Sequence, residues 1–203
     1  MAFTVTVTPT PLETIAGWVQ YSRQLAADAP ALRSLLNTEM PRDVLRKLES
    51  EVAGVVDAAT LPDTTGASGD PLIQVIREGI ATVETAGYSP SVLLGSPADL
   101  AALDIAVLNL GGSSAAIMGS SFWGLRPVPV PGFTKTIVAD AASAFTLFVR
   151  SGVEMYTTDS DITGAGATAA SAFRANILTT LAEMRAKGAV TNAAAATEII
   201  LTP

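Results

Sequence analysis

The sequence predicts an α+β fold, and two kinds of pattern carry this prediction. From Leu32 to Val55, apolar residues recur at spacings of three and four, which is typical of one face of a long helix. Other segments alternate apolar and polar residues or form short apolar runs between turn-forming residues, which is typical of strands. The 203 residues suffice to bury a sizeable core in one compact unit or in two small lobes.

The first part of the chain is expected to hold two strands and the long helix. Residues 3–8 alternate apolar side chains with threonine, and residues 15–21 form a second strand-like run. Asp28 is suited to cap the first turn of the helix, which we expect over 28–56. Pro41 lies inside the apolar stripe and lacks a backbone donor, so it is expected to kink or split the helix.

The middle of the chain is expected to alternate loops, helices and one strand. Residues 57–69 are rich in turn-forming residues and predict a loop. A second helix is expected over 70–87, because Gly87 is suited to end it in the left-handed conformation. Residues 91–94 form a short apolar strand, and a capping-box pattern then opens a third helix over 96–108.

The last part is expected to be mostly extended, with one ambiguous segment. Residues 111–121 are small and predict a flexible loop, and alternate prolines in 122–133 favour an extended segment that lacks some ladder donors. Residues 173–187 have apolar positions that fit a helix, and Glu183 with Lys187 would form an i,i+4 pair, so the pattern alone favours helix there. Further strands are expected at 137–139, 145–150 and 153–156, and a further loop at 159–170.

The composition indicates a chain that covers apolar surface by association. Hydrophobic residues make up 49% and charged residues only 15%, so packing against copies of the same chain is one expected solution. The formal net charge of −7 disfavours direct binding of a polyanion but is compatible with a container for DNA. The first ten residues lack the basic patch and apolar core of a signal peptide, and we expect no membrane-spanning segment.

The sequence predicts no catalytic, cofactor-binding or metal site. It contains no cysteine and no histidine, which removes disulfides, thiolate and imidazole ligands, and the Ser-His-Asp and Cys-His arrangements. Three weak candidates remain, and each is more simply an ordinary loop. They are a glycine loop at 164–169 similar to a dinucleotide-binding turn, an anion cradle at 111–121 without the usual lysine, and Asp159 with Asp161 as cation ligands.

Four stretches, taken together, carry a resemblance to a known family. They are IAGWVQYSRQLAADAPALRSLL from Ile15 to Leu36, LLGSPADLAAL from Leu93 to Leu103, Trp123-Gly124-Leu125 followed by Val128 and Val130, and AFRANILTTLAEMR from Ala172 to Arg185. In order and spacing they resemble the major capsid proteins of tailed phages, which have the Hong Kong 97-type fold. The stretches extend over nearly the whole chain.

The resemblance implies a division into two lobes. A peripheral lobe would hold 1–69 and 151–203, with the spine helix and a long C-terminal sheet, and an axial lobe at 70–150 would surround a five- or six-fold axis. It also implies that 173–187 is a long strand, because tertiary context overrides local propensity. The loop at the axis would contain small residues that let several copies crowd together, namely Gly111, Gly112, Ser113, Ser114, Gly119 and Ser120.

The function that the resemblance implies is structural. The chain would be a subunit of a phage or prophage capsid that self-associates into pentamers or hexamers and encloses DNA without specific recognition. Scaffold or portal proteins would be further partners, and the virion, assembled in the bacterial host cytoplasm, would be its location. Two alternatives stay open: the shell of an encapsulin-type compartment, which shares the fold but packages enzymes, and a small α/β ligand-binding or enzyme domain that uses the glycine loops.

The start of the chain and one pair of residues bear on how copies would be joined. The family's N-terminal arm and most of its extended loop find no counterpart here, so we expect monomers or small rings more readily than closed shells. Asn176 and Glu183 match family positions of a lysine–asparagine cross-link in which a glutamate takes the proton. Because the lysine partner belongs to the extended loop, we expect no isopeptide bond, and we expect both side chains to hydrogen-bond within the sheet.

Overall fold

The computed structural model describes residues 11–109, 123–163 and 170–200. Contacts within the chain divide it into two compact units. The first unit comprises Met1–Glu51 and Leu147–Lys187, and the second comprises Val52–Thr146 and Gly188–Pro203. Both contain helices and strands, so the predicted α+β class is confirmed.

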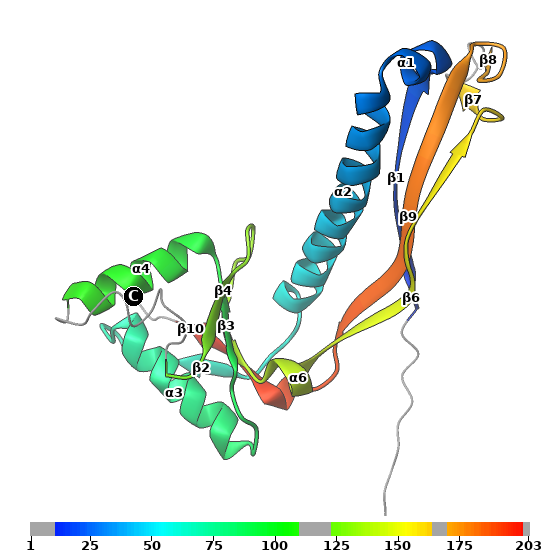
Figure 1. Ribbon diagram of the computed structural model, residues 1–203. Helices are drawn as coiled ribbons and strands as arrows, with labels where there is room; N and C mark the ends of the chain where they lie inside the picture. Colours follow the sequence, from blue (N-terminus) through cyan, green and yellow to red (C-terminus); the bar gives the residue numbers. More distant parts are fainter. Residues whose placement is uncertain (1–10, 110–122, 164–169, 201–203) are drawn as a thin grey trace, which may run out of the picture. The chain divides into compact units, whose positions relative to one another are not determined.

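A long helix and a three-stranded sheet form the first unit (Figure 1). Its elements are β1 (Glu13–Ser22), α1 (Arg23–Asp28), α2 (Pro30–Asp57), β6 (Phe145–Thr158), β7 (Ile162–Thr163), β8 (Ala170–Ser171) and β9 (Ile177–Val190), of which α2, β6 and β9 extend by a few residues into the second unit. The sheet has the order β1-β9-β6, and β1 runs antiparallel to β9. The part of α2 that belongs to this unit buries Val44 and Leu48.

Two features of the helical region differ from the sequence prediction, namely the capping residue at its start and its continuity at Pro41. Ser22 caps α1 by accepting a hydrogen bond from the Leu25 amide at 3.1 Å, whereas Asp28, the expected cap, is the last residue of α1. α2 continues through Pro41, so the predicted split is wrong. The carbonyl that Pro41 leaves without a helical donor belongs to Asn37, an exposed residue, and water is available to that carbonyl.

β9 is the central strand of the first sheet, and its burial alternates. Thr180, Ala182, Met184 and Ala186 are buried, which places the even positions on the side of the sheet that carries α2. The strand confirms the extended state expected from the resemblance for most of 173–187 and overrules the helical pattern, while 172–176 form a turn. β6 is one continuous strand where two were predicted.

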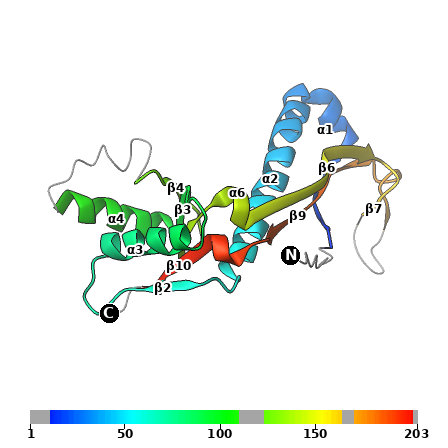
Figure 2. The same cartoon turned by 90° about the horizontal axis from the view of Figure 1, so that it is seen from below.

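The second unit is a five-stranded sheet with two helices on one face (Figure 2). Its elements are β2 (Asp63–Thr65), α3 (Leu72–Thr85), β3 (Val92–Gly95), α4 (Pro97–Asn109), β4 (Arg126–Pro129), β5 (Thr136–Ala139), α6 (Ala141–Ala144), a 3-10 turn (Ala193–Ala195) and β10 (Ala196–Ile200). The strand order is β2-β10-β5-β3-β4. β2 lies inside the segment predicted as a loop, and it exists through parallel pairing with the distant β10.

Two apolar clusters cover the two faces of this sheet. Val138 of β5 belongs to the cluster beneath α3 and α4, and its neighbours Ile137 and Ala139 belong to the cluster on the opposite face, as the alternation of a strand requires. Gly79 lets α3 approach β10 closely, because a Cβ there would lie 2.4 Å from the Ile199 Cδ1 atom. The helix pair and the sheet therefore form the better-buried part of the molecule.

β4 is extended, as the alternate prolines predicted, and it lies at the edge of the sheet. Among the described strands it pairs with β3 alone, and the amides of Arg126 and Val130 donate to the Ser91 and Gly95 carbonyls at 2.9 Å each. Pro127, which alternates with these donors, is tolerated at such an edge. The capping box before α4 is also present, with the Asp99 amide donating to the Ser96 hydroxyl at 3.1 Å.

The compact units do not follow the lobe boundaries expected from the resemblance. Residues 52–69 and 188–203 group with 70–146, because β2 and β10 are strands of the five-stranded sheet. The assignment of the units to axial and peripheral lobes remains a prediction.

Candidate assembly surfaces

The side of the first sheet that faces away from α2 carries exposed aromatic and apolar side chains. Because the even positions of β9 are buried on the helix side, Leu181 and Glu183 point to the other side. Trp18 lies opposite Leu181 in the register of β1 and β9 and shares that side. The central strand and one edge strand thus place an indole next to a leucine and a carboxylate.

β6 adds a tyrosine and a second carboxylate to the same side. Thr157 hydrogen-bonds to Thr180 at 2.9 Å on the helix side, so the adjacent Tyr156, and Glu154 with it, point away from the helix. The Tyr156 hydroxyl donates to the Glu154 carboxylate. This hydrogen bond, then the charge of Glu154, with smaller effects of desolvation and of the charge of Glu183, raise the pKa of Tyr156 above its ordinary value.

We call Trp18, Glu154, Tyr156, Leu181 and Glu183 the open sheet face. Trp18 is 66% exposed and Tyr156 is 52% exposed. Aromatic side chains that lie together in water are typical of surfaces that bind another protein, because they offer a large apolar area with little conformational freedom to lose. The open sheet face is therefore a candidate contact between copies of the chain.

A second candidate surface lies between α2 and the edge strand β1, next to Trp18 of the open sheet face. A groove of about 340 Å³ runs there. Ion pairs along α2 lie beside it, including Lys47 with Glu51 at 2.7 Å. The hydrogen bond to Lys47, followed by its charge, lowers the pKa of the Glu51 carboxyl. The groove is lined by Ile15, Ala16, Gly17, Trp18, Val19, Leu35, Leu36, Glu39, Met40, Asp43, Val44 and Lys47.

The two positions matched to a family cross-link are not brought together. Asn176 ends the turn before β9 with a φ of +56°, and its carbonyl accepts from the Arg23 amide at 2.9 Å. Glu183 lies further along β9, opposite Ala16, on the open sheet face. The six strand positions from Ile177 to Glu183 correspond to roughly 20 Å, so both residues could serve one reaction only across copies.

The predicted axis loop falls outside the described residues. This applies to Gly111, Gly112, Ser113, Ser114, Gly119 and Ser120, and also to the glycine loop at 164–169. Their roles remain predictions.

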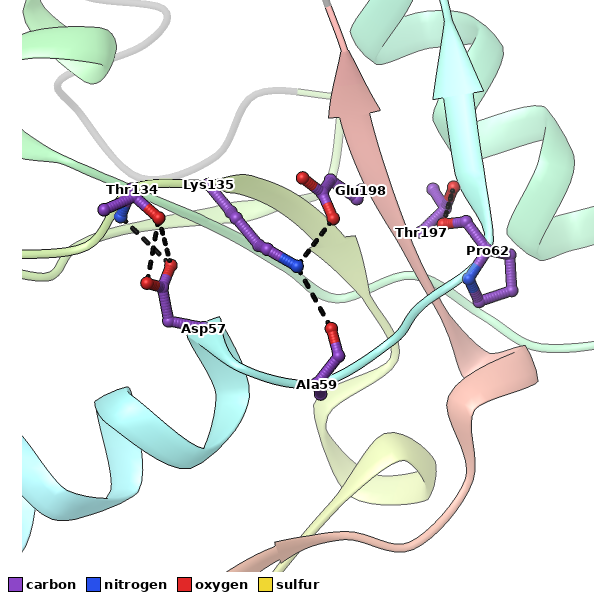
Figure 3. Close-up of polar contacts among 7 residues, drawn as sticks. All are labelled: Asp57, Ala59, Pro62, Thr134, Lys135, Thr197 and Glu198. Carbon is purple, nitrogen blue, oxygen red and sulfur yellow. Dashed lines mark hydrogen bonds and ion pairs between the residues drawn. The ribbon is translucent and has the colours of Figure 1, made fainter.

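Polar contacts fasten the end of α2 to the second unit's sheet (Figure 3). The Asp57 carboxylate accepts from the Thr134 amide at 3.0 Å and from its hydroxyl at 2.8 Å. Lys135 Nζ lies 2.8 Å from Glu198 Oε2 and donates to the Ala59 carbonyl at 3.0 Å. Because the Lys135 and Glu198 side chains are each 22% exposed, this junction is partly shielded from water.

The chain's other two lysines are engaged as well. Lys47 pairs with Glu51, and Lys187 pairs with Glu13. All three lysine ammonium groups of the chain are therefore held by carboxylates.

The turn at 172–176 in the first unit was not predicted from the sequence. Phe173 in this turn is 67% exposed, and the neighbouring Arg174 is exposed too. In the sequence Phe173 counted as part of an apolar stripe, since a pattern of hydrophobic positions does not reveal which of them remain in water. The exposure of Trp18 in β1 and Tyr156 in β6 could not be predicted for the same reason.

The described ranges contain no group of three or more acidic residues arranged to hold a metal ion. Asp159 instead forms an ion pair with Arg23 at 2.5 Å. Within those ranges, no helix is both long and apolar enough to span a membrane.

Comparisons with known proteins agree on one family. A model described as "Phage capsid family" matches residues 2–199. The "Major capsid protein" of Enterobacteria phage HK97 is 32% identical over 151 residues, which are 67% of this chain and 37% of that protein. The chain thus spans well under half the length of this curated relative.

Solved structures show the same fold at low sequence identity. A structure from Mycobacterium phage Adephagia matches with a TM-score of 0.67 at 18% identity, covering 95% of this chain and 72% of that one. A structure from Gordonia phage Cozz has a TM-score of 0.65 at 17% identity, with coverages of 100% and 78%. The holo-SrpI encapsulin complex from Synechococcus elongatus has a TM-score of 0.60 at 15% identity, with coverages of 93% and 73%.

Proposed function

The chain belongs to the phage capsid family, and from this premise we propose that it is a structural subunit of a phage or prophage capsid. Copies self-associate into pentameric or hexameric capsomers, and capsomers form an icosahedral shell around DNA. The match of the family model to residues 2–199 carries this proposal.

The surface of the first unit supports self-association. The open sheet face leaves Trp18 and Tyr156 in water, and only 15% of the chain's residues are charged. Burial of apolar surface at about 25 cal/mol per Å² is the main favourable contribution when copies meet. Aromatic side chains that are exposed in a single copy are covered when copies associate, so their exposure is expected in a self-associating subunit.

The role is structural, with no reaction assigned to the chain. DNA is enclosed rather than gripped, because the net charge of −7 repels phosphates at long range. Scaffold and portal proteins are the further partners expected during assembly in the bacterial cytoplasm, and the mature location is the virion.

An encapsulin-type shell is the second candidate, favoured by the fold shared with the encapsulin complex. That likeness is at 15% identity, whereas the capsid protein of phage HK97 is 32% identical. The contents of purified particles distinguish the two, since a capsid would hold nucleic acid and a compartment would hold packaged protein.

Expression of the chain in a bacterial host, followed by analytical ultracentrifugation and negative-stain microscopy, tests the proposal. Small rings that form with increasing concentration are the expected result, more readily than closed shells. A species that sediments as a monomer at every concentration, with no particles on the grid, would refute self-association. Nuclease treatment and mass spectrometry of any particles would identify what they contain.

A further inference from the structure

The turn at 172–176, here called the Phe173 turn, projects an apolar side chain and a cation from a fixed backbone. The Ala175 amide donates to the Ser171 carbonyl at 3.1 Å, and the Ile177 amide donates to the Ala172 carbonyl at 2.9 Å. Ala172 is fully buried and anchors the turn. Phe173 nevertheless remains 67% exposed. An exposed phenylalanine on a hydrogen-bonded turn is suited to a contact, because the backbone loses little conformational freedom when the side chain is covered.

Arg174 gives the Phe173 turn an unused positive charge. The structure gives Arg174 no ion-pair partner among the residues that it describes. Arg23, whose amide donates to the carbonyl of Asn176 in the same turn, is by contrast paired with Asp159. A guanidinium group offers several donors in a plane and also stacks on aromatic rings. The turn therefore presents an exposed phenylalanine and an exposed arginine at consecutive positions.

The open sheet face offers the complementary chemistry. Trp18 and Tyr156 supply exposed rings, with Leu181 opposite Trp18 in the adjacent strand. Glu154 and Glu183 supply two carboxylates on the same side. Neither carboxylate has a cationic partner within the described part of the chain, so their charges remain available to a cation from outside.

Arg185 is the nearest cation along β9 on this side. It is exposed at the next odd position after Glu183, and no ion pair within the described segments joins it to Glu183. Arg185 therefore leaves the Glu154 and Glu183 carboxylates available to a guanidinium group from another copy.

Within one copy, these two surfaces cannot meet. β9 pairs continuously with β1 from Ile177, opposite Ser22, to Ala186, opposite Glu13. The Phe173 turn precedes the start of this ladder, and Leu181 lies several extended residues further on, at about 3.4 Å per residue. A contact between them therefore requires two copies of the chain.

We propose that the Phe173 turn of one copy docks on the open sheet face of a second copy. Phe173 packs against Trp18 and Tyr156, and Arg174 pairs with Glu154 and Glu183. Because the two surfaces are different, the contact is head-to-tail, and its repetition builds rings or chains of copies. This inference rests on the proposed function as a self-associating subunit and names one contact of that association.

A charge exchange between two variants tests the contact. Arg174→Glu places like charges in every contact of that variant, and the double substitution Glu154→Arg with Glu183→Arg does the same from the other side. Each variant alone is expected to weaken self-association by about tenfold or more, measured by ultracentrifugation. Mixing the two variants restores opposite charges at each head-to-tail contact, so association is expected to recover.

A matched control carries the same change of charge elsewhere. Arg126→Glu alters an exposed arginine of β4, in the second unit, and is expected to associate like the original chain. Circular dichroism establishes that all variants are folded. If the original chain associates and the two variants associate equally well alone, or fail to recover when mixed, the contact is wrong while the proposed function stands. If the original chain never associates, the proposed function and this contact both fail.

Cysteine pairing provides an independent measurement, because the chain contains no cysteine of its own. Chains with Arg174→Cys are mixed with chains carrying Glu154→Cys and oxidised mildly. A disulfide-linked heterodimer is expected on a non-reducing gel, in excess over the product formed with chains carrying Arg126→Cys. Equal yields from the two mixtures would overturn the contact.

Discussion

Lys135 shows at the scale of single residues how the end of α2 is held. Its ammonium group pairs with Glu198 at 2.8 Å and donates to the Ala59 carbonyl at 3.0 Å. Lys135→Met is expected to lower the free energy of unfolding by about 1–3 kcal/mol, because it leaves a partly shielded carboxylate and a carbonyl without their donor. Urea denaturation measures this change.

The matched control for that change is Lys47→Met. Lys47 and Glu51 form an ion pair whose side chains are 61% and 44% exposed, so its loss is expected to lower the stability much less than the loss of the shielded Lys135 pair. Equal stabilities for the Lys135 and Lys47 variants would mean that shielding does not strengthen the junction.

The lysines also bear on covalent joining of copies. Each of the three is held by a carboxylate in the structure, and none lies near Asn176 in the sheet register. A protonated, paired ammonium group is a poor nucleophile toward an amide. We therefore expect assembled material to run as a single band of 20.8 kDa on a denaturing gel, with an intact mass that shows no loss of ammonia. A ladder of covalent multimers would contradict this expectation.

At the scale of elements, two glycines are expected to respond oppositely to alanine. A Cβ at Gly188 would lie 2.8 Å from the Val52 Cγ2 atom and 3.3 Å from its Cβ, so β9 and α2 would have to separate. Gly188→Ala is expected to destabilise the chain by about 1–3 kcal/mol. Gly54 in α2 has open space at its Cβ position, and Gly54→Ala is expected to stabilise by about 0.5–1 kcal/mol. Thermal unfolding compares the two, and the same sign for both would show that the close approach at Gly188 is relaxed easily.

Elements were predictable from sequence where local signals suffice. The apolar stripe of α2, the capping box of α4 and the prolines of β4 each act within a few residues, and these predictions were confirmed. β2 and β9 were misjudged from pattern alone, because β2 needs the distant β10 and β9 is extended between two partner strands. Pairing partners far along the chain leave no mark in a local pattern.

At the scale of the whole molecule, assembly is expected to change the surroundings of Trp18. In a Trp123→Phe background, Trp18 is the chain's only indole, and it is 66% exposed in the single copy. Its fluorescence emission is expected to shift to shorter wavelength as copies associate, because the contact removes water from the ring. A Trp18→Phe chain, which retains Trp123, serves as the control. Association seen by light scattering without any shift of Trp18 would place this ring outside the contacts.

The sequence could indicate that apolar surface had to be covered, but not where. Low charge content predicted association, and four ordered stretches predicted the family. The open sheet face depends on which side of β9 α2 covers, and that is decided by burial of Met184 and Ala186 rather than by composition. The candidate axis residues, such as Gly111, lie outside the described residues and stay predictions.

The prolines of β4 limit aggregation of subunits before they assemble. The amides of Arg126 and Val130 point toward β3, so the alternate positions, occupied by Pro127 and Pro129, are those whose amides would face outward. Proline has no hydrogen to offer there, and an incoming strand from another molecule finds no donors at these positions. This edge of the five-stranded sheet therefore resists open-ended stacking into insoluble ribbons. Concentrated subunits therefore avoid strand-to-strand aggregation at this edge and can still associate through their side chains.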